Sequence, residues 1–179
     1  MLSITIPESE FFDPESNKFI KVKQQTLVLE HSLVSLAKWE SKWEKPYLSS
    51  SKTLEEVIDY IRCMTITQNV NPLVYYGMTD KNIEDINNYI EASMTATWFS
   101  ESKSSRRNSE VVTAEIIYYW MITLGIPFEC QKWHLNRLLT LIRVCTIKNS
   151  PPKKMNKKEA ALERKRLNEQ RKRQFNTKG

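Results

Sequence analysis

Glycine and histidine are scarce in this 179-residue sequence. The three glycines, Gly77, Gly125 and Gly179, stand far apart, which excludes the glycine-rich phosphate loops of Walker A and dinucleotide-binding proteins. The two histidines, His31 and His134, leave no HExxH zinc motif and no histidine-rich metal site. A G-x-S-x-G nucleophile elbow is also absent. We therefore expect a protein that is not an enzyme and that uses no metal or cofactor.

Cysteines and long hydrophobic runs are few as well. Cys63, Cys130 and Cys145 are odd in number and widely spaced, which is not typical of a secreted disulfide framework. The longest apolar stretch, Ile116–Phe128, is too short for a bilayer, which takes about 20 helical residues. The first residues lack the basic and apolar regions of a signal peptide. These features predict a soluble protein of cytoplasmic type with no membrane partner.

Charge is distributed unevenly along the chain. Residues 1–150 carry 16 Lys and Arg against 18 Asp and Glu, a net charge of −2. Residues 151–179 carry 11 Lys and Arg against 3 Glu, a net charge of +8. Pro151 and Pro152 mark the boundary, because a proline disfavours helix in the residue before it. The pattern predicts a globular domain over 1–150 and a basic C-terminal tail over 151–179.

The first thirty residues have strand patterns. Leu2, Ile4 and Ile6 alternate with polar residues, as in a half-buried strand. Residues 19–23 and 26–30 are two further strand candidates, and the segment 13–17 has turn composition. We expect a small antiparallel β meander over 1–30.

Helical patterns fill the rest of the globular domain. Thr53 and Glu56 have capping-box spacing, Thr79 precedes an apolar stripe, and Gly125 followed by Pro127 is a typical helix stop. The helices expected in this way cover residues 31–43, 53–64, 79–90, 110–124 (capped by Ser109) and 130–145, with a further helical stretch over 157–174. The fold class is thus α+β, mainly α, with a bundle of about five helices over 31–150 and a basic, helical C-terminal tail.

Two features could carry chemistry, and each has a structural interpretation. Cys130 and His134 would share one face of a helix if the 130–145 prediction is right, but a metal site needs further ligands that the neighbourhood lacks. The carboxylate pairs Glu55-Glu56 and Glu84-Asp85 lie near helix starts, where acidic residues stabilise the helix dipole. The sequence therefore favours structural roles for all of them.

Tryptophans supply the candidate contacts with a partner protein. Trp39 and Trp43 are four residues apart on a predicted helix that also carries lysines. They form either a docking face, since tryptophan is enriched in binding hot spots, or part of the core. The core interpretation is favoured. Trp98 and Phe99 are a second candidate patch. The aromatic run Tyr118–Met121 and the later segment Cys130–His134 are interpreted as core, because the residues between them are too apolar for a groove that binds bases.

The basic tail is a candidate electrostatic binding segment. Its partner is nucleic acid, an acidic protein or solvent alone, and these alternatives stay open. The cations concerned are Lys153, Lys154, Lys157, Lys158, Arg164, Lys165, Arg166, Arg171, Lys172 and Arg173.

Several blocks of the sequence resemble small proteins of tailed bacteriophages. The blocks are residues 31–46, 94–100, 115–120, 128–143 and 176–179. They look like the tail assembly chaperones of long-tailed phages. The resemblance implies a viral, non-catalytic protein of virion morphogenesis that works in the host cell cytoplasm. Such a chaperone binds the tape measure protein, keeps its apolar stripes soluble and passes it to tail tube subunits.

Two other functions compete with the chaperone. One is a structural virion component, such as a neck or tail-completion protein, and the other is a nucleic-acid-binding accessory protein that acts through the basic tail. The sequence leaves open whether the chain forms a homo-oligomer.

Overall fold

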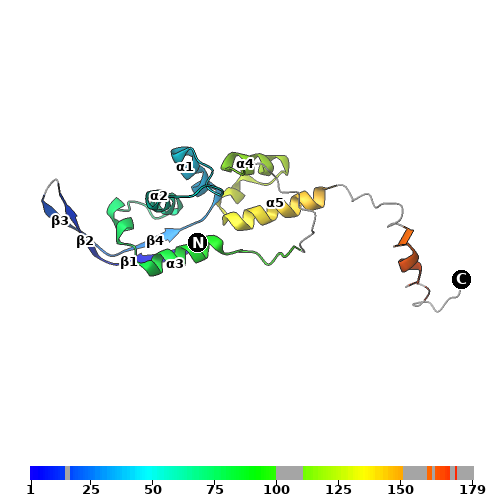
Figure 1. Cartoon of the computed structure of the whole chain (residues 1–179), viewed down its shortest axis with the longest axis horizontal. Coiled ribbons are helices and arrows are strands. Elements are labelled where there is room, and N and C mark those ends of the chain that lie inside the picture. The colour runs from blue at the N-terminus through cyan, green and yellow to red at the C-terminus, as the bar shows by residue number, and fades with distance from the viewer. Residues whose placement is uncertain (15–16, 100–110, 151–160, 163, 170–171, 173–179) are drawn as a thin grey trace. The chain divides into compact units, whose positions relative to one another are not determined.

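The chain has an α+β fold that is mainly α. The computed structural model describes residues 1–14, 17–99, 111–150, 161–162, 164–169 and 172. It divides into two compact units, Met1–Thr146 and Ile147–Gly179 (Figure 1). The fold class expected from the sequence is confirmed.

The N-terminal strands form one long hairpin. β1 (Leu2–Ile6) pairs antiparallel with β4 (Gln25–Leu29), and β2 (Ser9–Asp13) pairs antiparallel with β3 (Lys18–Val22). The two pairs share one register and are separated where Pro7, which cannot donate a ladder hydrogen bond, interrupts the first strand.

The expected strands are present, but the pairing differs from a meander. β2 has no strand pattern in the sequence. It pairs with β3, and β4 therefore pairs with β1. The predicted turn lies at the tip of this hairpin, where Asn17 has a φ of 51°.

Capping boxes define the starts of three helices. α1 (Leu33–Trp43) begins after Ser32, α2 (Leu54–Met64) after Thr53 and α3 (Asp80–Glu91) after Thr79. Each cap side chain accepts a hydrogen bond from the backbone N–H three residues on. A short 3-10 helix, η1 (Pro72–Gly77), lies between α2 and α3. The predicted box at Thr53 is confirmed, and the helix expected after Thr79 begins there with a box of its own.

The last two helices of the first unit begin later than the sequence pattern indicates. α4 (Ala114–Thr123) starts after Thr113, and residues 111–113 are not helical, whereas the sequence predicts a start at residue 110. The predicted cap, Ser109, lies outside the described residues. Gly125, with a φ of 65°, follows the end of α4 as predicted, and the Ile126 N–H donates to the Met121 carbonyl at 2.8 Å.

The predicted helix over 130–145 is in fact two elements. A 3-10 helix, η2 (Phe128–Lys132), precedes α5 (Leu135–Asn149). Cys130 therefore lies in η2, whereas His134 precedes α5 and its Nδ1 accepts a hydrogen bond from the Asn136 N–H at 3.3 Å. The expectation that these two side chains share one helix face is wrong.

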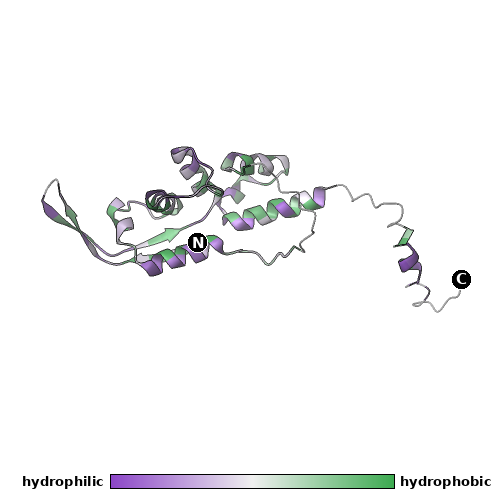
Figure 2. Ribbon diagram, in the orientation of Figure 1, coloured by the Kyte–Doolittle hydropathy of each residue, from purple (hydrophilic) through white to green (hydrophobic). Residues whose placement is uncertain are grey.

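Two hydrophobic clusters form the core, and α1 contributes to both. The first holds the inner sides of β1 and β4 with α2, η1, α3 and Trp39. The second holds Leu33 and Leu36 with α4, the segment around η2 and α5. Hydrophobic and hydrophilic residues alternate around α3 and α5 (Figure 2), as expected for helices with one face on a core.

Candidate protein-binding surfaces

The indole of Trp39 belongs to the core and not to the surface. It has no exposed area, and its Nε1 donates to the Glu56 carbonyl at 2.8 Å. Trp43 is half-buried, and its Nε1 donates to Asp59 Oδ2 at 2.9 Å. The core interpretation therefore holds for Trp39, which a partner cannot reach. Trp43 joins α1 to α2 instead of standing free.

Buried carboxylates extend this connection between α1 and its neighbours. Glu56 pairs with Lys45, and the Lys45 ammonium, through its hydrogen bond, lowers the pKa of Glu56. Glu40 accepts hydrogen bonds from the backbone N–H groups of Tyr47 and Ala114, both at 2.7 Å. Ala114 is the first residue of α4, so Glu40 caps α4 from another helix. These groups stabilise the fold.

The β2–β3 hairpin, hereafter the hairpin arm, extends beyond β1 and β4 away from the helices (Figure 1). Opposite residues on its outer face are Phe12 and Phe19, with ring centroids 5.4 Å apart, and the ion pair Glu10–Lys21 at 2.8 Å. We call these four residues the arm face. Phe12 is 53% exposed and Phe19 is 68% exposed. Two neighbouring phenylalanines are therefore left in solvent.

The other face of the hairpin arm attaches it to the body. Phe11 packs against the first core cluster, and Val22 is buried within it. Gly77 of η1 lies so close to the base of the arm that a Cβ atom there would stand 2.4 Å from Ser9 Oγ. The arm is therefore held at its base while the arm face stays exposed.

A second apolar surface lies on α4 and η2. Tyr119 is 64% exposed, and Ile122, three residues on and so on the same side of α4, is 63% exposed. Phe128 is also exposed, and its ring centroid lies 6.4 Å from the ring centroid of Tyr118. The core interpretation of the aromatic run fits Met121, which is fully buried, but it is wrong for Tyr119.

The segment that carries Trp98 and Phe99 runs beside α5. Asn136 of α5 donates through Nδ2 to the carbonyls of Ile90 and Ala92, both at 2.9 Å, and the Arg143 guanidinium lies 4.1 Å from the Phe99 ring centroid. Trp98 is 84% exposed. Of the four predicted contact residues, Trp98 is the most accessible and Phe99 is partly covered by Arg143.

A buried polar cluster joins the starts of α1 and α5 to the end of α3. Tyr60 Oη lies 2.6 Å from His31 Nδ1, and the ring centroids of His31 and His134 are 5.1 Å apart. His134 Nε2 lies 2.9 Å from the Tyr89 carbonyl oxygen. Burial, and secondarily the charge of His134, lowers the pKa of His31 to about 3. His31 is therefore a neutral packing residue at physiological pH.

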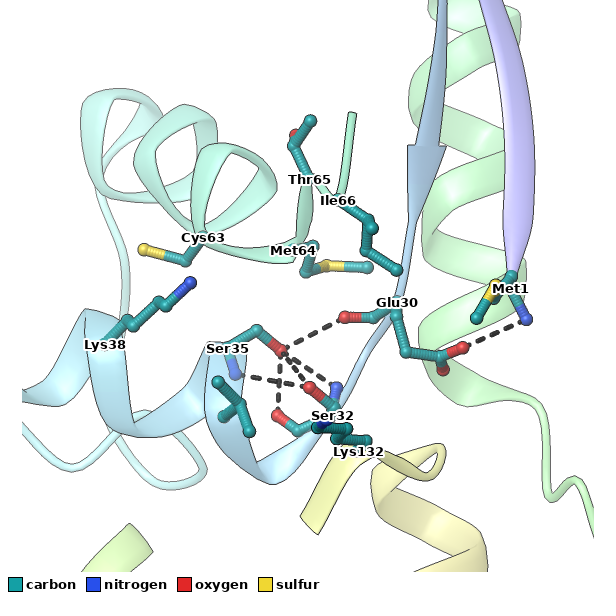
Figure 3. Close-up of a pocket in the computed structure, with 11 residues that line it drawn as sticks. Met1, Glu30, Ser32, Ser35, Lys38, Cys63, Met64, Thr65, Ile66 and Lys132 are labelled. Atoms are coloured by element: carbon teal, nitrogen blue, oxygen red, sulfur yellow. Dashed lines mark hydrogen bonds and ion pairs between the residues drawn. The ribbon is translucent and has the colours of Figure 1, made fainter. Parts of the chain in front are cut away.

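A pocket of about 450 Å³ opens beside the start of α1 and the end of α2 (Figure 3). Lys38, Lys132 and Cys63 are among the residues that line it. Burial raises the pKa of the Cys63 thiol, so the unreactive protonated form prevails at neutral pH. The hydroxyl of Ser35 is already used, because it donates to the Ser32 carbonyl at 2.8 Å. The pocket thus contains cations but no activated nucleophile among its lining residues.

The structure describes part of the basic tail. Residues 161–162, 164–169 and 172 are helical and exposed, in agreement with the predicted helical stretch. Four of the predicted binding residues belong to this part: Arg164, Lys165, Arg166 and Lys172. The other six lie outside the described residues: Lys153, Lys154, Lys157, Lys158, Arg171 and Arg173.

The described part of the chain offers neither a metal site nor a membrane-spanning helix, and the chain matches no known protein in the comparisons. Within the described ranges, no group of three or more His, Cys, Asp or Glu residues could hold a metal ion, and no helix is long and apolar enough to cross a membrane. No protein-family model, curated protein or solved structure matches the chain. The exposed apolar surfaces and the resemblance between sequences are therefore the basis for a functional proposal.

Proposed function

We propose that this chain is a non-catalytic tail assembly chaperone of a long-tailed bacteriophage. In this proposal it binds the tape measure protein, tail tube subunits or both in the host cell cytoplasm. The blocks of sequence described above resemble such chaperones. The observation that carries the proposal is the exposed pair Phe12 and Phe19 on the arm face.

The arm face has the energetics of a binding surface. Full burial of a phenylalanine side chain contributes about 1.5–3 kcal/mol, and somewhat more than half of each ring is exposed. Covering both rings would therefore contribute about 2–4 kcal/mol, or roughly 30- to 700-fold in Kd. Aromatic residues of this kind dominate the free energy of binding at many protein interfaces.

The charge of the arm face indicates which partner it fits. Glu10 and Lys21 neutralise each other at 2.8 Å beside the aromatic pair. The face therefore offers apolar area without net charge, which suits an apolar stripe of a helix better than a charged surface. A long helical partner could also contact Trp98 and the Tyr119–Ile122 surface, which are exposed elsewhere on the same unit.

Co-expression with the tape measure protein tests the proposal. The variant Phe12→Thr/Phe19→Thr removes both rings and keeps residues that favour strands. We expect the wild-type chain to keep the tape measure protein soluble and to co-purify with it after nuclease treatment, and the variant to lose most of this effect.

The matched control removes charge from the same face and leaves its apolar area in place. Glu10→Gln/Lys21→Gln should behave as wild type. Equal solubilisation by wild type and Phe12→Thr/Phe19→Thr would contradict the role of the arm face. Retention of the chain in purified virions would favour the structural-component alternative.

A further inference from the structure

The basic tail presents several cations on one side of a helix. Arg164, Lys165 and Lys172 lie on one helical face together with Asn168 and Glu169. Lys165 and Lys172 are seven residues apart, which is close to two helical turns. This face therefore carries three positive charges against one negative charge.

These cations are accessible to a partner. Arg164, Lys165, Arg166 and Lys172 are all exposed. Within the described part of the tail, none of them belongs to an ion pair. The whole stretch 151–179 has a net charge of +8, whereas residues 1–150 have −2. The positive charge of the chain is concentrated in this tail, and no described acidic residue forms an ion pair with these four cations.

The described residues of the tail helix, 161–162, 164–169 and 172, form no apolar stripe. Leu162 and Leu167 are exposed, but they are five residues apart and so point about 140° away from each other around the helix. A helix that packs on another protein, or lies in a membrane surface, needs a continuous apolar face. The partner of this helix must therefore be recognised through charge, which favours a polyanion of high charge density.

We propose that the basic tail binds the phosphate backbone of duplex DNA without preference for base sequence. An α-helix about 10–12 Å across fits the B-DNA major groove, which is about 12 Å wide and lies between the two phosphate backbones, whereas the major groove of A-form RNA is deep and narrow. Arg and Lys on phosphates release counterions, which gives affinity without specificity. This activity goes beyond the proposed chaperone function and does not depend on it.

Fluorescence anisotropy of the full chain with a labelled duplex of about 30 base pairs tests the proposal, with the salt concentration varied from about 50 to 300 mM. The variant Arg164→Gln/Lys165→Gln/Arg166→Gln/Lys172→Gln keeps good helix formers and removes four charges. We expect its plot of log affinity against log salt to be shallower by about 3–4, and its affinity at 100 mM salt to be at least about tenfold lower.

Three controls accompany this comparison. Glu169→Gln changes the same helical face and should leave affinity unchanged or raise it. Phe12→Thr/Phe19→Thr should bind DNA as wild type does, so that failure of the chaperone proposal and failure of this one are distinguishable. A scrambled duplex should bind with the same affinity as the original.

Three results would overturn the proposal. The first is no binding of duplex DNA by the wild-type chain at about 50 mM salt. The second is a salt dependence that the four substitutions leave unchanged. The third is binding of single-stranded RNA, or of an acidic polypeptide such as poly-glutamate, in preference to the duplex.

Discussion

Burial of His31 makes the stability of the protein depend on pH in a defined range. The ordinary pKa of histidine is 6.5, and burial lowers the pKa of His31 to about 3 in the folded chain. Between these values the unfolded chain binds a proton that the folded chain does not. Stability from neutral His31 is therefore fully present above pH 6.5 and is lost as the pH falls toward 3.

The size of this effect follows from the two pKa values. A full loss at low pH corresponds to on the order of 5 kcal/mol. Over the narrower interval from pH 7 to pH 5, the contribution of His31 to the free energy of unfolding falls by about 2 kcal/mol. Carboxylates that titrate in the same interval add their own pH dependence, so His31 must be isolated by a comparison of variants.

Urea unfolding of wild type and His31→Gln at pH 7 and pH 5 provides that comparison. The wild type should lose about 2 kcal/mol more than His31→Gln over this interval, whatever the stability of the variant at pH 7. Tyr60→Phe is the matched control: it removes the hydroxyl 2.6 Å from His31 Nδ1 but leaves the ring buried, so the wild-type pH dependence should remain. Equal losses in wild type and His31→Gln, or an NMR titration of His31 near pH 6.5, would refute the reasoning.

Two further predictions concern positions that fix the fold. Glu40→Ala removes the acceptor of two backbone N–H groups at 2.7 Å and should lower the free energy of unfolding by about 2–4 kcal/mol. In the same urea titration, Glu84→Ala, at an exposed position, should change the free energy of unfolding by less than about 0.5 kcal/mol. Equal effects of the two substitutions would contradict the capping role of Glu40. Gly77→Ala should destabilise by about 1–2 kcal/mol, because the new methyl group meets Ser9 Oγ. Ser9→Ala should restore part of that loss in the double variant, and thermal melts that show purely additive effects would contradict the contact.

Local signals explain what the sequence predicted well. The box that begins with Thr53 involves residues three positions apart, so it forms wherever the helix is placed in the fold. Gly125 ends α4 because it takes a positive φ at little cost. Such features depend on a few neighbouring residues and are visible in the sequence.

Features that depend on distant residues were missed. β2 has no alternating pattern, because the adjacent Phe11 and Phe12 place one ring on each side of the hairpin arm. The start of α4 depends on Glu40, which is 74 residues away in the chain. Neither position carries a local signal for its role.

The candidate contacts show the same limit. Trp39 and Trp43 have the spacing of one helix face, and this spacing is identical for a buried and an exposed pair. Only the position of α2 decides that Trp39 is covered. The exposed Phe12 and Phe19 were missed as contacts because nothing in the sequence shows that their strands lie beyond the core.

Capture from infected cells tests the chaperone proposal most directly. Tagged full-length chain and Phe12→Thr/Phe19→Thr would be recovered from phage-infected cells with and without nuclease treatment, and bound proteins identified by mass spectrometry. The proposal predicts that wild type recovers the tape measure protein or the tail tube protein and that the variant recovers far less. Recovery of neither protein by wild type, or recovery that disappears on nuclease treatment, would contradict it.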